Sequence, residues 1–244
     1  MTGLGFAGHP FLSWAQDLGI SPIYSGLQTD RYLSDFSVET RISDDKVFTE
    51  GPAVDRAGVV YFTNIRMNKI LTWNPLDKQL SVFNSVSNAS NGLRFLPNGD
   101  LLVCEGGSGK VVSYDMAGGE KTVMADQFNG KSLQAPNDLD YDSKGRVYFS
   151  SRTGKPDLEK ENKKSVYRID PDGQVHQLLS EPQVQMPNGV AVSPDDKTLY
   201  VIETNAKENG NRKILAFDLG ADGSITNQRT VIDFYPGRSG DGMC

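Results

Sequence analysis

Five short segments of this 244-residue chain set a carboxylate or a side-chain amide beside glycine or proline. They are Glu50-Gly51-Pro52, Asn91-Gly92-Leu93, Pro136-Asn137-Asp138, Pro187-Asn188-Gly189 and Gly240-Asp241-Gly242. Such side chains suit a hard divalent cation, because Ca²⁺ takes about six to eight oxygen ligands from carboxylates, amide carbonyls and water. Glu50 and Asp241 would together balance two positive charges, and Asn137 and Asn188 would add neutral carbonyl oxygens.

These segments also have a purely local explanation, because Asn-Gly and Pro-Asn are common turn residues where a strand begins. That explanation suffices for any single position, and it keeps Asn91 outside the ligand set. The coincidence of Glu50, Asn137, Asn188 and Asp241 favours a metal site instead. No His or Cys belongs to the set, which disfavours structural zinc. We therefore predict one divalent cation, Ca²⁺ by preference, with Mg²⁺, Mn²⁺ and Zn²⁺ as alternatives.

The spacing of the five segments indicates which elements position them. Their polar residues follow one another at steps of 41, 46, 51 and 53 residues, from position 50 to position 241. Each step holds short β-branched and aromatic runs separated by polar turns, such as 59–62 and 70–73, and helical periodicity is hard to find after Asp35. A repeat of this length built from four strands is typical of a β-propeller, whose innermost strands begin near one mouth of the channel. The five segments should therefore meet at that mouth.

We predict an all-β chain with an irregular or partly helical N-terminal segment at 1–35 and a propeller domain at 36–244. Six blades of about 48 residues would need about 290 residues. A fifth unit opens at Asp241, however, and the sequence stops at Cys244. The expected fold is a six-bladed β-propeller that is truncated at its C-terminus and retains about four to five blades. A complete four-bladed or open form is the alternative.

The composition excludes several classes of function. With 25 Lys and Arg against 31 Asp and Glu, the formal charge is −6. The chain thus lacks the basic face that nucleic acids require and the polybasic segment that anionic membranes attract. No apolar run approaches the roughly 18 residues of a membrane helix, and the N-terminus does not resemble a signal peptide. We expect no nucleic-acid or membrane partner, a cytoplasmic location, and two reduced thiols with Cys104 packed in a strand.

Other catalytic patterns fail on their spacing. The segment 106–110 resembles a phosphate-binding loop, but Val111 stands where Ser or Thr is needed. The segment 237–240 lacks the second glycine of a nucleophile elbow, since Asp241 stands there. Only His9 and His176 could serve a histidine-based triad, and we expect both to be structural or exposed.

Four longer segments are similar, in order and spacing, to motifs of the gluconolactonase, senescence marker protein (regucalcin) and luciferin-regenerating enzyme family. They read EGPAVDRAGVVYFTNIRMNKI, ADQFNGKSLQAPNDLDYDSKGRVYFSS, QMPNGVAVSPDDKTLYVIET and SGDGMC, and the match runs from about Phe48 to the end. The resemblance implies a six-bladed propeller with one divalent metal, often calcium, at the mouth of the channel. It assigns the metal ligands to Glu50, Asn137, Asn188 and Asp241. It also implies the truncation, because family members continue well past the GDGM motif.

A metal held in this way would leave coordination positions open for a substrate. It could polarise a lactone carbonyl and stabilise the developing oxyanion, with Asp241 as general base toward water or as a direct nucleophile. The resemblance implies hydrolysis of small sugar lactones to aldonic acids, so a gluconolactonase-like hydrolase is the first hypothesis. The residues expected to contact the substrate are Asn137, Asn91, Glu105, Arg152 and Glu203, with Asn64 nearby.

Two alternatives keep the fold and the metal. The same propeller could act on another ester or on a phosphotriester, because the metal ligands would be shared and the pocket loops would decide the substrate. A metal-stabilised propeller could also serve as a binding scaffold without turnover. The sequence leaves the oligomeric state open.

Overall fold

The computed structural model of the chain describes residues 37–152 and 157–243. Contacts divide the chain into two units, Met1–Val38 and Glu39–Cys244, and nearly all described residues belong to the second. The predicted N-terminal segment 1–35 and His9 lie outside the described residues. Within those residues, no helix is long and apolar enough to cross a membrane.

The described residues form four antiparallel sheets of four strands each. The first sheet holds β1 (Thr49–Val54), β2 (Val60–Asn64), β3 (Lys69–Asn74) and β4 (Gln79–Asn84), with a short 3-10 helix, η4 (Ile65–Met67), after β2. The second holds β5 (Ser90–Phe95), β6 (Leu101–Glu105), β7 (Lys110–Tyr114) and β8 (Lys121–Ala125). The third holds β11 (Pro136–Tyr141), β12 (Val147–Ser151), β13 (Ser165–Ile169) and β14 (Val175–Ser180). The fourth holds β15 (Pro187–Val192), β16 (Thr198–Thr204), β17 (Arg212–Leu219) and β18 (Ile225–Asp233).

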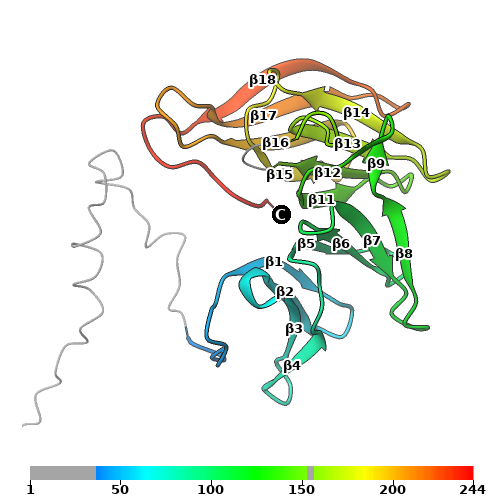
Figure 1. The fold of residues 1–244 in the computed structure, drawn as a ribbon, viewed down its shortest axis with the longest axis vertical. Coiled ribbons are helices and arrows are strands. Elements are labelled where there is room, and N and C mark those ends of the chain that lie inside the picture. Colours follow the sequence, from blue (N-terminus) through cyan, green and yellow to red (C-terminus); the bar gives the residue numbers. More distant parts are fainter. Residues whose placement is uncertain (1–36, 153–156, 244) are drawn as a thin grey trace, which may run out of the picture. The chain divides into compact units, whose positions relative to one another are not determined.

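Within each sheet the strands are paired in chain order (Figure 1). A two-stranded ribbon of β9 (Gln127–Phe128) and β10 (Lys131–Ser132) connects the second and third sheets. The arrangement confirms the predicted all-β class and the four-stranded repeat of a propeller. The total of six blades stays a prediction.

Apolar side chains fill the space between consecutive sheets. Strand β6 shows how, because Leu101, Leu102, Val103 and Cys104 are all fully buried. Leu101 and Val103 pack toward the first sheet, whereas Leu102 and Cys104 pack toward the third. A strand buried on both faces appears in the sequence as a continuous apolar run rather than an alternating one. Cys104 is a free thiol inside this core, as predicted.

The innermost strand of every sheet leaves its regular pairing at the same point. The register with the second strand shifts within the intervals 50–53, 90–93, 136–139 and 187–190. A local shift of this kind bends a strand and changes the direction of its side chains. Each interval contains one of the polar positions 50, 91, 137 and 188 that the sequence singled out. The backbone is therefore irregular where the candidate ligands lie.

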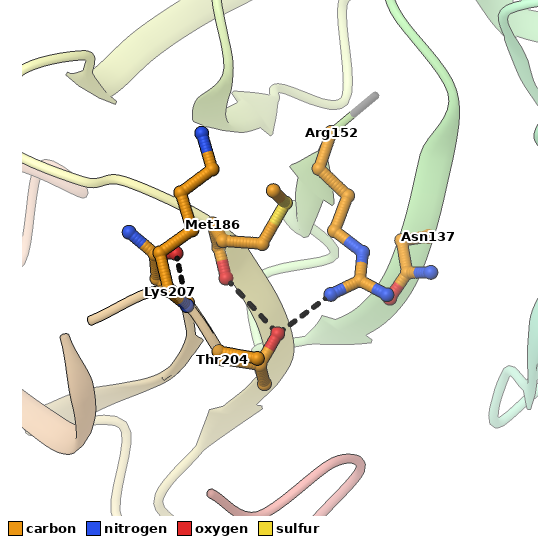
Figure 2. Close-up of a pocket in the computed structure, with 7 residues that line it drawn as sticks. Asn137, Arg152, Met186, Thr204 and Lys207 are labelled. Carbon is orange, nitrogen blue, oxygen red and sulfur yellow. Dashed lines mark hydrogen bonds between the residues drawn. The ribbon is translucent and has the colours of Figure 1, made fainter. Parts of the chain in front are cut away.

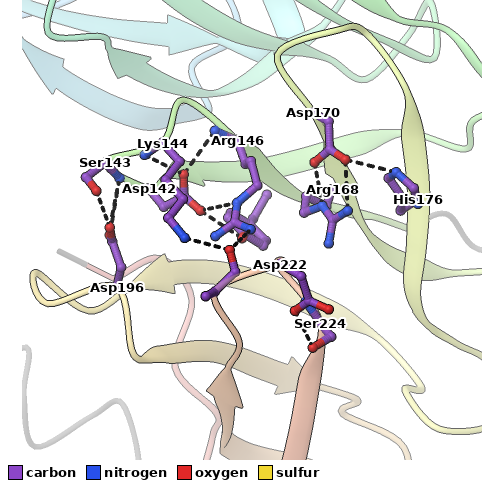
Figure 3. A network of polar contacts seen from close by, with 12 residues as sticks. Asp142, Ser143, Lys144, Arg146, Arg168, Asp170, His176, Asp196, Asp222 and Ser224 are labelled. Atoms are coloured by element: carbon purple, nitrogen blue, oxygen red, sulfur yellow. Dashed lines mark hydrogen bonds and ion pairs between the residues drawn. The ribbon is translucent and has the colours of Figure 1, made fainter.

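At the far end of β11, a polar network closes the turn to β12 (Figure 3). The Asp142 carboxylate accepts hydrogen bonds from Arg146 Nε at 2.5 Å and from the Tyr148 hydroxyl at 3.0 Å. Arg146 Nη1 also donates to the carbonyl oxygen of Ala221, in the turn between β17 and β18, at 3.1 Å. Asp142 and Arg146 are both buried, so a desolvated ion pair within the third sheet holds the arginine that hydrogen-bonds to the fourth.

His176 lies in β14, the outer strand of the third sheet, as predicted. Its Nε2 lies 3.0 Å from Asp170 Oδ2, and Arg168 binds the same carboxylate through two hydrogen bonds of 2.6 and 2.9 Å (Figure 3). The histidine thus lies beside the Arg168–Asp170 ion pair, far along the strands from the irregular segments.

Candidate functional site

The inner strands β1, β5, β11 and β15 lie side by side in that order, and their first residues are closely packed. An ideal Cβ on Gly51 would lie 2.2 Å from the carbonyl oxygen of Asn91. One on Gly189 would lie 2.3 Å from the carbonyl oxygen of Asp241. Only glycine allows such an approach. The first segment therefore touches the second, and the fifth touches the fourth, as a common mouth requires.

Replacing Gly51 by alanine should destabilise the fold by about 3 kcal/mol, because a left-handed backbone costs about 1–2 kcal/mol and overpacking against Asn91 adds a similar amount. The φ angle at Gly51 is 51°, and that at Gly58 is 84°, where a Cβ would meet nothing within 4 Å. Gly58→Ala is therefore the matched control and should cost only the backbone part. Urea unfolding of both variants measures the difference. Equal losses would show that the approach to Asn91 contributes nothing.

The candidate ligands interact with one another electrostatically. Asn188 Nδ2 donates to Asp241 Oδ1 at 2.5 Å. Burial raises the pKa of Glu50, and the negative charge of Asp241 raises it further, whereas Arg152 acts in the opposite direction. A bound cation would offset this unfavourable effect on the Glu50 carboxylate. Asn137 and Asn188 are buried, Glu50 is half-buried, and Asp241 is exposed.

A pocket of about 720 Å³ opens beside these residues (Figure 2). Its lining residues are Asn137, Arg152, Met186, Thr204, Asn205, Ala206 and Lys207. Asn137 lies in β11 and Arg152 directly follows β12 in the third sheet. In the fourth, Met186 precedes β15, Thr204 ends β16, and the remaining three residues follow β16. Of the residues predicted to contact substrate, Asn137 and Arg152 therefore line the pocket. Asn91 does not line it and packs against Gly51 of the first sheet.

Arg152 is held in the pocket by the fourth sheet. Its Nη1 donates to Thr204 Oγ1 at 2.7 Å, and this hydroxyl lies 3.4 Å from the Met186 carbonyl oxygen, to which it donates. Burial lowers the pKa of Arg152, while the charges of Asp241 and Glu50 oppose that shift. The guanidinium is thus fixed in orientation and lies in the field of both candidate carboxylate ligands.

Asp138 and Asp140 take part in the site's framework, although the sequence did not single them out. Asp138 Oδ2 accepts the backbone N–H of Val190 at 3.1 Å, and Asp140 Oδ2 accepts that of Val192 at 2.8 Å. The two carboxylates thereby accept hydrogen bonds from two backbone N–H groups on the edge of β15 that faces β11, and they link the two strands. Burial raises the pKa of Asp138 to about 6. The available signal was the pair of aspartates at alternate positions, since Asp is disfavoured inside a strand.

Three polar residues at the ends of second strands anchor the chain as it enters the inner strands. Glu105 accepts hydrogen bonds from Asn88 Nδ2 and Ser108 Oγ, each at 2.8 Å. Glu203 accepts backbone N–H groups of Gln185 and Met186, and Asn64 accepts that of Phe48 at 3.0 Å. All three anchors are buried, and none of them lines the pocket. They position the approach to the site, and substrate contact by Glu105 and Glu203 stays a prediction.

The anchor Glu203 should make stability depend on pH. Burial raises its pKa above the ordinary 4.5. Stability from a group whose pKa is raised by folding is fully present below its unfolded pKa and is lost as pH rises through the folded pKa. Relative to Glu203→Gln, the unchanged chain should therefore lose unfolding free energy between about pH 4 and about pH 7. Urea unfolding at both values checks this, with exposed Glu208→Gln as control. A pH-independent difference would contradict it.

The donor set fits a hard cation better than a soft one. Among residues 37–152 and 157–243, no cluster of three or more His, Cys, Asp or Glu side chains could hold a metal ion. The residues predicted as ligands, Glu50 and Asp241 with the amides of Asn137 and Asn188, would form a mixed oxygen set instead. Rotation of the Asn188 amide would present its oxygen in place of the nitrogen that now bonds Asp241. Oxygen-only sets of this kind are typical of Ca²⁺ and Mg²⁺.

Known proteins are similar to this chain in sequence and in fold. The chain is 27% identical over 213 residues to a gluconolactonase of Zymomonas mobilis, covering 79% of this chain and 58% of the relative. A gluconolactonase of Xanthomonas campestris superimposes with a TM-score of 0.68 at 27% identity, covering 82% of this chain and 67% of that one. A calcium-binding regucalcin of Agrobacterium tumefaciens has the same fold, with a TM-score of 0.59 at 19% identity, covering 80% of this chain and 61% of that one. The chain thus spans less than two thirds of the curated gluconolactonase.

A family model described as the SMP-30/Gluconolactonase/LRE-like region matches residues 48–244. The matched region begins two residues before Glu50 and contains all four sheets, the pocket and each of the five polar segments. The resemblance inferred from the four longer sequence segments is confirmed, and the chain belongs to the SMP-30/gluconolactonase/LRE-like family.

Proposed function

We propose that this site hydrolyses small sugar lactones with the help of one bound divalent cation. The proposal is supported by the hydrogen bond between Asn188 and Asp241 and by the effect of the Asp241 charge on the pKa of Glu50, near a pocket that Asn137 lines. Relatives named gluconolactonase indicate the substrate class. The chain spans 58% of the length of the Zymomonas mobilis gluconolactonase, so lactone hydrolysis is a proposal for this chain.

Four side chains are proposed to hold the cation, which would be Ca²⁺ by preference. Glu50 and Asp241 would supply two charges, and Asn137 and Asn188 would supply amide oxygens. The regucalcin that shares the fold is described as calcium-binding, which agrees with this preference. Mg²⁺, Mn²⁺ and Zn²⁺ are the competing ions for the same oxygens.

The bound cation would polarise the lactone carbonyl and lower the pKa of a water molecule. Asp241 is proposed to take a proton from the attacking water as general base. The water oxygen bonds to the carbonyl carbon, the ring C–O bond breaks, and the proton passes to the ring oxygen, so that a hydroxy acid leaves. Asn137 can donate from Nδ2 to a substrate oxygen, and Arg152 presents its N–H groups beside Asn137 (Figure 2).

Calorimetric titration with Ca²⁺ followed by a lactone assay tests the proposal. We expect about one ion per chain, and hydrolysis of glucono-1,5-lactone above its spontaneous rate that a chelator removes and added Ca²⁺ restores. An aryl ester and a phosphotriester run in parallel distinguish the neighbouring chemistries. Metal binding without turnover of any of the three would support a binding scaffold, and absence of metal binding would overturn the ligand assignment.

A further inference from the structure

The pocket wall is cationic, although the chain as a whole is acidic. Its seven lining residues include Arg152 and Lys207 and no carboxylate, whereas the net charge of the chain is −6. Lys207 lies on the loop after β16 and is exposed, and no acidic side chain of the described residues comes within 4.0 Å of its ammonium group. Figure 2 shows the two cations on opposite walls, with Met186 and Thr204 between them. Positive charge is concentrated at this pocket.

Arg152 lacks a contact ion pair. Its guanidinium is bonded to the neutral hydroxyl of Thr204, and no described carboxylate lies within 4.0 Å of it. The charges of Glu50 and Asp241 reach it only from a longer distance. A partly buried guanidinium without a direct anionic partner is costly to the fold. A ligand that brings such a partner would recover that cost.

With a divalent cation bound, the pocket and its neighbouring carboxylates would carry a net positive charge. The two carboxylates of Glu50 and Asp241 carry −2, which a divalent ion cancels. Arg152 and Lys207 then leave the pocket with a charge of +2 that no lining residue opposes. A neutral sugar lactone could not form an ion pair with Arg152 or with Lys207.

We infer that the preferred substrate is an anionic sugar lactone, bearing a phosphate or carboxylate group that Arg152 and Lys207 bind. This inference rests on the proposed function, because it names the substrate class of the same site. A guanidinium presents parallel N–H groups that match the two oxygens of a phosphate or carboxylate, and an ammonium group adds a point charge. Arg152 is then the principal specificity-determining residue, and Lys207 assists it from the opposite wall.

Competing lactones measure the inference directly. The kcat/KM for the 6-phosphate ester of glucono-1,5-lactone should exceed that for the neutral lactone by about 30-fold or more, with a carboxylate-bearing lactone separating the two anion types. Lys207→Met should lower this ratio about 2–5-fold, and Arg152→Met should lower it about 10–100-fold. Added salt should lower it as well. Lys78→Met, in the exposed β3–β4 turn, is the matched control and should leave the ratio unchanged.

The outcomes separate this inference from the proposed function. If the neutral lactone is hydrolysed as fast as both anionic ones, the inference is overturned and the lactonase proposal stands. If no lactone is hydrolysed, the lactonase proposal fails, and binding of glucose 6-phosphate against glucose then decides the anion site. Tighter binding of the phosphate, lost in Arg152→Met and weakened in Lys207→Met, supports the site. Equal binding of the two sugars overturns it.

Discussion

Asp241→Asn should lower kcat/KM for lactone hydrolysis about 10³-fold, because general-base catalysis alone contributes about 10²–10⁴-fold. The same change removes one of the two charges proposed to hold the cation, so calorimetry should show a large loss of Ca²⁺ affinity. Asp241 is exposed, and Asn nearly matches its shape, so the free energy of unfolding without metal should stay unchanged. Loss of metal binding with an intact fold is the expected signature.

Glu120→Gln is the matched control for this experiment. Glu120 is exposed in the turn between β7 and β8, away from the pocket, and the substitution removes the same unit of charge. It should leave both Ca²⁺ binding and turnover as they are. An Asp241→Asn protein that binds Ca²⁺ as tightly as the control would exclude Asp241 from the ligand set.

Asp142→Asn should cost about 4 kcal/mol of unfolding free energy, within the range of about 3–5 kcal/mol found when one partner of a buried ion pair is removed. The side chain of Asp142 is 0% exposed and that of Arg146 is 7% exposed, so the guanidinium would be left charged and unpaired. The Tyr148 hydroxyl would also lose its charged acceptor. Urea unfolding measures the loss of unfolding free energy, and the melting temperature should fall by about 2–4 °C for each kcal/mol lost.

The corresponding turn of the fourth sheet provides the control. Asp195 pairs with Lys197 at 3.7 Å, but the two side chains are 59% and 79% exposed. Asp195→Asn should therefore cost less than about 1 kcal/mol. Adding Arg146→Met to Asp142→Asn should restore much of the loss, because no buried charge is then left without a partner. A double variant as unstable as the single one would show that packing, rather than the unpaired charge, causes the effect.

The repeat could be predicted from sequence because each unit is short and consists of strands that follow one another in the chain and pair with one another. A strand such as β6 is buried on both faces, so its apolar run is continuous, and polar turns mark both of its ends. Neighbouring strands are paired in chain order, which makes each four-stranded sheet a local product of about fifty residues. The number of blades depends on closure between distant parts of a chain, and no local pattern specifies it.

The site was predictable only in part, for a related reason. The recurring positions 50, 137, 188 and 241 are visible as spacing, and the structure brings these segments together. Glu105 and Glu203 were expected to contact the substrate, and their role as buried anchors was not predicted. Their direction depends on which donors the segment before the inner strand of the same sheet leaves free, and this becomes visible only when the strands are packed. Asp138 and Asp140 were missed because their partners lie about fifty residues away on β15.

The close contact between the first residues of successive inner strands has a thermodynamic consequence. The segments that approach one another there are separated by steps of 41 to 53 residues along the chain. An ion bound there by residues of several sheets would act as a reversible cross-link between them. At about 100 times its dissociation constant it would add about 2.7 kcal/mol to the unfolding free energy. Cooperativity between the sheets should therefore rise and fall with the concentration of the free ion.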